Sequence, residues 1–215
     1  MLALGVCLLG LLILLITAEI IGKKKLLKGE YHRKFLHITA GSFIAFWPWL
    51  ISWQWIQALG LAMAAGMLAN HYFNFLNFRG KIGRATYGDI FYALAIFIAA
   101  LLTDNKTFFA LAILEVALAD GLAAVAGIGY GKHWTYKVFS NKKTVIGSMV
   151  FWIVTVCIFG TGLLPVHDLI SFQNYFLILL LAPPAFTFLE NISMFGLDNL
   201  VLAIATIILL QAVKY

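Results

Sequence analysis

One stretch of the sequence, ALADGLAAVAGIGYGKHWTYKVFSNKKTVIGS, combines the residue types that hold phosphate groups. Its polar and glycine residues include Asp120, Gly127, Gly129, Gly131, Lys132, Lys142, Lys143 and Thr144. A carboxylate in an apolar helix is energetically costly, so it is retained for a partner or for a function. The glycines let backbone N–H groups approach an anion without obstruction by a Cβ atom, and adjacent lysines neutralise phosphate charge. The stretch therefore predicts a phosphate site.

Each part of this stretch also has a simpler explanation. Glycine-rich turns are common in loops, and lysines beside a membrane helix anchor it on the cytoplasmic side. The stretch is not a Walker A loop, because Lys132 is followed by His133 and lacks the earlier glycine at the required spacing. The motifs of the protein-kinase catalytic loop are also absent from the sequence. We favour phosphate binding because an acid, three glycines and two adjacent lysines occur together.

A second group of polar residues lies in GEYHRKFLHITAG, near the start of the chain. If this segment is helical, Glu30, Arg33 or Lys34, and His37 recur at spacings of three and four residues and share one face. The alternative is a basic collar attracted to anionic lipid headgroups, which explains the lysines that precede this segment. A collar does not explain Glu30 and His37, so a face that lines a site stays open as the second interpretation.

Further acids lie at the ends of apolar runs. Asp89 and Asp198 each precede such a run, so each is a candidate helix N-cap, and for Asp89 this is the simpler interpretation. Asp198, together with Glu190 at the end of the preceding run, is also a candidate Mg²⁺ ligand, because Mg²⁺ prefers oxygen ligands. Glu115 precedes Asp120 by five residues, which places it about 140° away around the same helix at about 100° per residue. It faces either the site or a neighbouring helix.

Apolar helices must position these residues. The 215-residue chain is 63% hydrophobic and 11% charged, with a mean hydropathy of +0.96, whereas a soluble domain is about 25% charged. Runs that approach the length needed to cross about 30 Å of hydrocarbon recur along the whole chain. They cover residues 2–21, 36–52, 55–73, 89–102, 107–127, 145–164, 174–190 and 199–213. We predict an all-α, polytopic membrane protein with about eight transmembrane helices, the first at 1–21, in one domain over residues 1–215.

The basic residues predict which side of the membrane the polar groups face. Of the 15 lysines and arginines, 13 fall in the first, third and fifth loops, within residues 23–34, 79–84 and 132–143. Because positive residues accumulate in cytoplasmic loops, the polar groups lie at or just below the cytoplasmic face. A soluble nucleotide and a membrane lipid can meet there. A transporter would carry its polar residues nearer the bilayer midplane, so an enzyme is favoured over a transporter.

Three motifs in this order resemble the polyprenol kinase family, which includes dolichol kinase, phytol kinase and the CTP-dependent diacylglycerol kinase. They are ExxRKxxH at 30–37, ADGLAAVAGIGYGK followed by NKKTVIGS within 119–148, and E…GLDN within 190–199. The resemblance covers residues 29–215. It implies an integral membrane enzyme that moves the γ-phosphate of CTP, or of another nucleotide, to a lipid alcohol at the cytoplasmic membrane face.

The resemblance also implies roles for the residues above. Mg²⁺ is expected on Asp120, with Asp198 or Glu190 as the second ligand. The triphosphate is expected on Arg33, Lys34, Lys132, Lys142, Lys143 and Thr144, and on the backbone of Gly127, Gly129 and Gly131. The base that takes the proton from the lipid hydroxyl is expected to be His37 or a carboxylate such as Asp89 or Glu115. Asp120, Lys143, His37 and Asp89 are therefore the candidate catalytic residues.

The central motif is also similar to that of the phosphatidate cytidylyltransferases. Those enzymes carry a long C-terminal signature with KD and HGG elements, in whose place this chain has GLDN. A cytidylyltransferase is therefore the second interpretation and a transporter the third. We expect no nucleic-acid partner. The lipid acceptor stays open between diacylglycerol and a polyprenol-like or phytol-like isoprenoid alcohol, as do the choice of CTP or ATP and the oligomeric state.

Overall fold

The computed structural model describes residues 2–24, 26–27, 29–73, 87–139 and 141–214 of the chain. Over these residues the protein is helical apart from one two-stranded hairpin, which confirms the all-α fold class. The elements are α1 (Leu2–Lys23), α2 (Glu30–Ala45), the 3₁₀ turn η1 (Trp47–Trp49), α3 (Trp53–Phe73), α4 (Gly88–Leu102), α5 (Lys106–Leu114), the π-helical turn η2 (Glu115–Asp120), α6 (Gly121–Tyr130), β1 (Thr135–Val138), β2 (Asn141–Thr144), α7 (Val145–Gly162), the 3₁₀ turn η3 (Leu164–Val166), α8 (Phe172–Ile192) and α9 (Asp198–Ala212).

Every predicted apolar run overlaps one of these helices. Among the helices that the structure describes, four are long and apolar enough to cross a membrane: α1, the continuous helix Lys106–Tyr130, α7 and α8. Helices α4 and α9 are apolar but shorter. The chain is thus a membrane protein, and the count of about eight crossings stays a prediction beyond these four.

The continuous helix Lys106–Tyr130, called the central helix below, runs through the middle of the fold. It joins α5, η2 and α6, and its most apolar window is 72% buried, compared with 28% for α7 and 11% for α1. Its many alanines and glycines let α2, α7 and α9 pack closely against it. A π-helical turn inside an α-helix is rare and is frequent at functional sites, and here it ends at Asp120.

Prolines in two apolar runs predict a bend or an interruption, because proline lacks the N–H that a helix requires. At Pro48 the prediction is confirmed, since α2 ends at Ala45 and a 3₁₀ turn follows. At Pro183 and Pro184 the helix is not interrupted, and α8 continues through both residues. The carbonyl of Pro183 accepts a hydrogen bond from Thr187 Oγ1 at 2.7 Å, so a side chain satisfies part of the local backbone.

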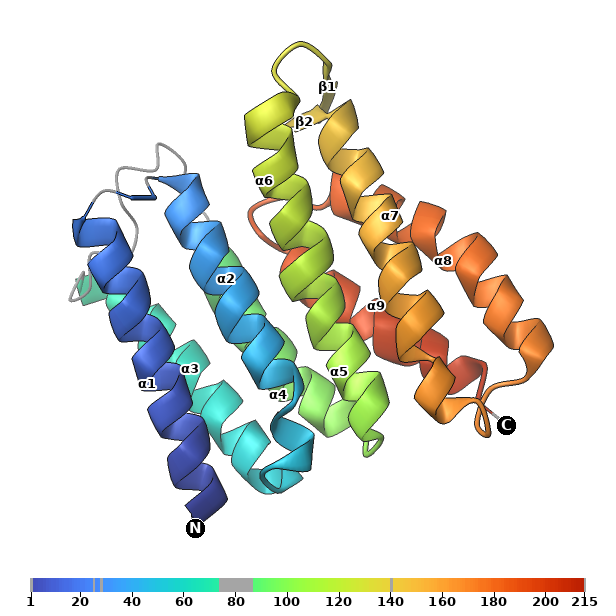
Figure 1. Cartoon of the computed structure of the whole chain (residues 1–215), viewed down its shortest axis with the longest axis horizontal. Helices are drawn as coiled ribbons and strands as arrows, with labels where there is room; N and C mark the ends of the chain where they lie inside the picture. Colours follow the sequence, from blue (N-terminus) through green and yellow to red (C-terminus); the bar gives the residue numbers. More distant parts are fainter. Residues whose placement is uncertain (1, 25, 28, 74–86, 140, 215) are drawn as a thin grey trace.

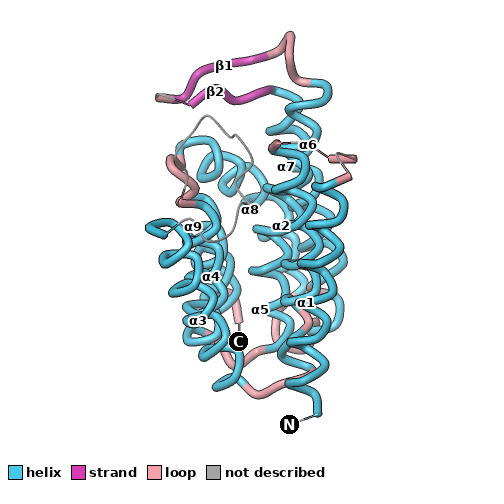
Figure 2. Tube along the Cα trace, turned by 90° about the vertical axis from the view of Figure 1, so that its left-hand side faces the viewer, coloured by secondary structure: helices cyan, strands magenta, loops and turns pink. Residues whose placement is uncertain are grey.

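The helices form two layers, which Figure 2 shows edge on. One layer contains α1, α2, the central helix and α7, and the other contains α3, α4 and α9. Helix α8 packs against α7 and α9 and so joins the layers on one side (Figure 1). The central helix contacts members of both layers, which makes it the element best placed to carry a buried site.

Two of the basic loops lie at the same end of the bundle, as the predicted sidedness requires. Helix α1 ends and α2 begins at the end where the hairpin projects, and the N-terminus lies at the opposite end (Figures 1 and 2). Lys23 and the lysines of residues 132–143 therefore share one end, whereas Lys106 begins the central helix at the other. The third basic loop, at 79–84, lies outside the described residues.

Candidate active site

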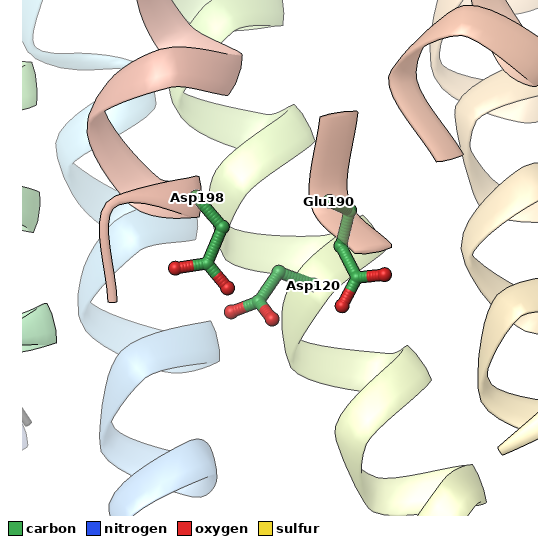
Figure 3. Close-up of side chains that lie close together, drawn as sticks. All are labelled: Asp120, Glu190 and Asp198. Atoms are coloured by element: carbon green, nitrogen blue, oxygen red, sulfur yellow. The ribbon is translucent and has the colours of Figure 1, made fainter. Parts of the chain in front are cut away.

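Three carboxylates that are distant in sequence meet below the hairpin. Asp120 ends the π-helical turn, Glu190 lies in the last turn of α8, and Asp198 begins α9. One carboxylate oxygen of each lies within 4.8 Å of those of the other two (Figure 3). Carboxylates at such distances repel one another unless cations lie among them. The structure thus brings together the three residues that the sequence nominates as metal ligands, and their oxygen atoms are the donor type that Mg²⁺ prefers.

Neither Asp198 nor Asp89 caps a helix through its side chain. The N-cap residues of α9 and α4 are Leu197 and Tyr87, and neither helix has a side-chain capping bond. The cap interpretation of both acids is therefore wrong. Each acid lies in the first turn, where the helix dipole still favours a negative charge. Asp198 Oδ1 accepts a hydrogen bond from the N–H of the next residue, Asn199, at 3.2 Å, which leaves Oδ2 for other contacts.

The loop between α8 and α9 brings Glu190 and Asp198 together. It turns at Phe195 and Gly196, whose φ angles are 58° and 89°. A positive φ is easy for glycine but uncommon for phenylalanine, so the surrounding structure must hold Phe195 in place.

Two hydrogen bonds fix this loop and the first turn of α9 to the start of α4. The Tyr87 N–H donates to the Phe195 carbonyl at 3.1 Å. The buried side chain of Asn199 donates through Nδ2 to the Gly88 carbonyl at 2.7 Å. The first turn of α9, which carries Asp198, is therefore held against the first turn of α4, which carries Asp89.

Two lysines lie next to the acids. Lys34 donates a hydrogen bond to Asp120 Oδ2, and Lys143 donates to Glu190 Oε1 and, at 3.0 Å, to the Glu190 carbonyl. Burial works to lower the pKa of Lys143, but the charge and hydrogen bond of Glu190, together with the nearby Asp198 and Asp120 carboxylates, outweigh burial and raise the pKa, so this lysine stays charged. Because each ammonium is held by a carboxylate, both charges keep a fixed position beside the cluster.

Asp198 is the acid without such a partner. No lysine or arginine lies within 4.0 Å of its carboxylate in the part of the chain that the structure describes. Burial and the nearby Asp120 carboxylate raise the pKa of Asp198 to about 6. A divalent cation at the cluster would reverse this effect, because it would favour the charged form of every acid around it.

The cluster opens into a cavity of about 860 Å³, which lies within the range of about 300–1,000 Å³ typical of small-molecule sites. The predicted site residues that line it are Arg33, Lys34, Asp120, Gly127, Lys132, Lys142, Lys143, Thr144, Glu190 and Asp198. With Glu30, the described lining holds five basic and four acidic side chains. This mixture suits a metal-bound polyphosphate better than a bare anion, since the acids would repel an anion that carried no metal.

The β1–β2 hairpin positions Lys142 and Lys143 at the cavity. The antiparallel strands pair Lys137 with Lys142 and Tyr136 with Lys143. The Tyr136 hydroxyl hydrogen-bonds Ser148 Oγ of α7 at 2.5 Å and donates to Asn191 Oδ1 of α8 at 2.7 Å. These bonds fasten the hairpin to both helices. The sequence predicts a loop over this segment, and its motifs do not indicate roles for Tyr136 and Ser148.

The three glycines do not form the predicted phosphate loop. Gly127 and Gly129 lie within α6, and the Gly131 N–H donates to the Gly127 carbonyl at 3.0 Å. Their N–H groups are thus part of the helix, and only Gly127 lines the cavity. The glycines instead permit a close approach, because a Cβ on Gly127 would lie 2.7 Å from Thr144 Oγ1. Thr144 in turn caps α7 by accepting a hydrogen bond from the Gly147 N–H at 3.0 Å.

This packing predicts different effects for two matched substitutions. In Gly131→Ala, the new Cβ would lie 2.6 Å from both the Gly127 carbonyl oxygen and Thr144 Cβ, so we expect a loss of about 1–3 kcal/mol in stability. In Gly129→Ala, the Cβ would meet only Tyr31 Oη at 3.5 Å, an ordinary contact. Thermal unfolding of both variants in detergent should show a lower midpoint for Gly131→Ala alone. Equal midpoints would show that the hairpin does not depend on close packing at Gly131.

His37 and Asp89 line a second, smaller cavity of about 160 Å³ on the other side of α2. His37 donates a hydrogen bond through Nε2 to the Val116 carbonyl at 3.0 Å, and the same nitrogen lies 3.6 Å from Asp120 Oδ2. Asp89 Oδ1 lies 3.7 Å from Arg33 Nη1. Arg33 lines both cavities, so these two candidate bases lie beside the phosphate cavity without lining it.

Glu115 lines neither cavity. It is fully buried, and its Oε1 accepts a hydrogen bond from Thr155 of α7. Of the two interpretations left open by the sequence, the structure supports the contact with a neighbouring helix. Glu115 therefore ceases to be a candidate base.

The chain is similar to one well-defined relative. A phytol kinase from Synechocystis sp. is 30% identical over 212 residues, which cover 93% of this chain and 86% of that protein. No protein-family model matches the chain, and no solved structure matches it. The similarity therefore extends over nearly the whole chain and is not confined to the carboxylate cluster and the hairpin.

Proposed function

The chain belongs to the polyprenol kinase family, and from this premise we propose that it transfers the γ-phosphate of CTP to the hydroxyl group of a lipid alcohol. The observation that carries this proposal is the convergence of Asp120, Glu190 and Asp198 in a cavity that five basic side chains of the described residues also line. Phosphoryl transfer requires charge neutralisation and alignment of the reacting groups, and both can be supplied by such a set of side chains.

The acids of the cluster fit a Mg²⁺ ion. Asp120, Glu190 and Asp198 would hold it, and when bound it would neutralise charge on the phosphate oxygens. The side chains around the cluster have separate tasks. Lys34 and Lys143 hold Asp120 and Glu190 in place through their hydrogen bonds and add positive charge at the cavity wall.

The remaining basic residues would bind the nucleotide. Arg33, Lys132 and Lys142 line the same cavity, and their charges match the negative charge of a triphosphate. The first turn of α7, with Gly147 and Ser148, also lines the cavity and adds the partial positive charge of a helix N-terminus. We propose that nucleotide enters this cavity from the cytoplasm, because the basic first and fifth loops lie at this end of the bundle.

The base that accepts the proton of the acceptor hydroxyl would be Asp89 or His37. Both line the smaller cavity that meets the phosphate cavity at Arg33. The Nε2 proton of His37 is donated to the Val116 carbonyl, which leaves Nδ1 as the nitrogen that can accept a proton. Asp89 can accept the proton at either carboxylate oxygen, so its role as a base does not depend on a particular tautomer.

A double-label assay tests the proposal. Purified protein in lipid nanodiscs is incubated with Mg²⁺, a lipid alcohol or phosphatidic acid, and CTP labelled at either the α- or the γ-phosphate. We expect γ-label in the phosphorylated alcohol and no α-label in lipid. Incorporation of α-label with release of pyrophosphate would show a cytidylyltransferase and overturn the kinase proposal. Parallel reactions with γ-labelled ATP and CTP compare the two donors.

A further inference from the structure

One aromatic side chain lines the cavity that contains the carboxylate cluster. The side chains assigned above to the metal and to the phosphates are charged, and they offer no apolar surface to a nucleobase. Among the described residues that line this cavity, Phe195 is the only aromatic one, and it is 59% exposed. Every nucleobase has a flat π face, so an exposed aromatic ring is a suitable partner for it.

Phe195 lies close to the carboxylate cluster. It precedes Asp198 by three residues, and its neighbours Ser193 and Gly196 line the same cavity. A chain segment of three residues spans at most about 10–11 Å. The ribose and the phosphates of one nucleotide can bridge such a distance. A nucleotide with its phosphates at the acids can therefore place its base at Phe195.

Phe195 occupies a turn position that is unfavourable for phenylalanine. The Leu197 N–H donates to the Met194 carbonyl at 3.0 Å, which closes a four-residue turn with Phe195 and Gly196 at its centre. Their φ angles of 58° and 89° are those of a type I′ turn, in which Gly, Asn and Asp dominate the central positions. Backbone strain of this kind clusters at functional sites. Because the ring is exposed, burial in the core does not offset the strain.

Two backbone hydrogen bonds hold the turn in place. The Phe195 carbonyl accepts from the Tyr87 N–H at 3.1 Å, and the Gly196 carbonyl accepts from the Asn199 N–H at 3.3 Å. The first bond joins the turn to the start of α4, and the second joins it to the first turn of α9. The backbone that carries the ring is thus fixed relative to Asp198. A contact that is already positioned costs less ordering when a ligand binds.

We propose that Phe195 stacks on the base of the nucleotide whose phosphates bind at the carboxylate cluster. This inference rests on the proposed function, in which a nucleoside triphosphate is the phosphate donor. The base lies against the exposed ring at the α8–α9 turn, and the phosphates extend from there toward Asp198 and Lys143. Because every base has a π face, this contact favours a nucleotide over a bare polyphosphate without selecting one base.

Phe195→Asn removes the ring and suits the turn, because Asn adopts a positive φ readily. The ligand is a CTP analogue with a methylene bridge between the β- and γ-phosphorus atoms. We expect its affinity, measured with Mg²⁺ on protein in lipid nanodiscs without lipid alcohol, to fall at least about fivefold. The affinity for inorganic tripolyphosphate, which has no base, should stay unchanged. Equal losses for both ligands, or no loss for either, would overturn the inference.

Two further variants separate the ring from the turn. Phe195→Tyr keeps an aromatic ring and should retain the affinity for the analogue. Phe139→Asn is the matched control, because Phe139 is the other non-glycine residue with a positive φ, 52°, among those that the structure describes. It is 75% exposed and does not line the cavity, so its replacement should leave the affinity unchanged. Equal losses in Phe139→Asn and Phe195→Asn would contradict stacking on Phe195.

Photo-crosslinking of the unsubstituted protein separates this inference from the kinase proposal. 5-Iodo-CTP carries its iodine on the base, and on irradiation it should label the peptide that contains Phe195, with CTP as competitor. If this peptide is labelled but no lipid alcohol is phosphorylated, the base site stands and the kinase proposal fails. If γ-phosphate is transferred but the label lies on the exposed Tyr130 or Trp134 instead, the base site is wrong and the kinase proposal stands. Labelling of Phe195 by a diazirine phospholipid that CTP does not displace would show that the ring contacts lipid, and would also overturn the inference.

Discussion

Asp120→Asn should reduce phosphoryl transfer by about a thousandfold or more, the order of effect seen when a group that stabilises transition-state charge is removed. Asn keeps the size of the side chain but removes the negative charge that the metal cluster requires. Asp120 is also the acid in the middle of the site, since it hydrogen-bonds Lys34 and lies 3.6 Å from His37. Transfer of γ-label to lipid, measured at saturating nucleotide, gives the rate.

The control for this variant is Asp104→Asn. Asp104 is exposed in the loop between α4 and α5, at the end of the bundle opposite the hairpin, and its loss should leave the rate unchanged. Because Asp120→Asn leaves the buried Lys34 ammonium without its carboxylate, circular dichroism and gel filtration must show that the variant is folded. Normal turnover by a folded Asp120→Asn protein would contradict a metal-binding role.

Asp198→Asn gives an independent test of the same cluster. Asp198 has no ion pair among the described residues. Removing its negative charge therefore leaves no buried lysine without a carboxylate partner. We expect this variant to require a higher Mg²⁺ concentration for half-maximal activity.

Lys143→Met should reduce the rate by about a hundredfold, because it removes a positive charge held beside the metal cluster. Lys143 is half-buried and is bonded to both the carboxylate and the carbonyl of Glu190. The matched variant is Lys142→Met. Lys142 is exposed, so its charge is screened by solvent, and its loss should reduce the rate by less than about tenfold.

Steady-state rates for both lysine variants, measured across a range of CTP concentrations, separate binding from turnover. We expect Lys143→Met to lower kcat, and Lys142→Met to act mainly on the KM for CTP. Equal losses in the two variants would show that the two ammonium groups act together on the phosphates, and that the pairing with Glu190 confers no special role.

The carboxylate cluster could be predicted from the sequence because its members lie at the ends of apolar runs. Helix length and the alternation of basic loops place Glu190, Asp198 and the end of the helix containing Asp120 at the same side of the membrane. That reasoning needs no knowledge of which helices are neighbours. The same sidedness predicts Lys34 and Lys143 at this face for binding phosphate, and in the structure each hydrogen-bonds an acid of the cluster.

The glycines show where the sequence pattern fails. Alternating Gly127, Gly129 and Gly131 are typical of a loop, yet α6 continues to Tyr130 because its small residues pack against Thr144 and Gly147. This tertiary contact outweighs the low helix propensity of glycine, and no local pattern reveals it. The hairpin was missed for a similar reason, since the bonds that hold Tyr136 connect it to α7 and α8.

Helical periodicity places Glu30, Arg33 and His37 on one face of α2, whereas the structure divides that face between two cavities, with His37 at the smaller one. Spacing shows that Arg33 and His37 share a face of α2, but it does not show which neighbours that face contacts. The π-helical turn between Glu115 and Asp120 is likewise not visible in the sequence, and it invalidates the estimate of their angular separation at 100° per residue.

Two hydrogen bonds join the α8–α9 loop and the first turn of α9 to the start of α4. They join a backbone segment next to a metal ligand to the segment that carries Asp89, although the two are more than a hundred residues apart in the chain. A shift of this loop on binding of a cation and a nucleotide would therefore reach the first turn of α4, which carries the candidate base Asp89. In the proposed reaction, nucleotide binding would thereby set the position of the candidate base before the lipid hydroxyl is engaged.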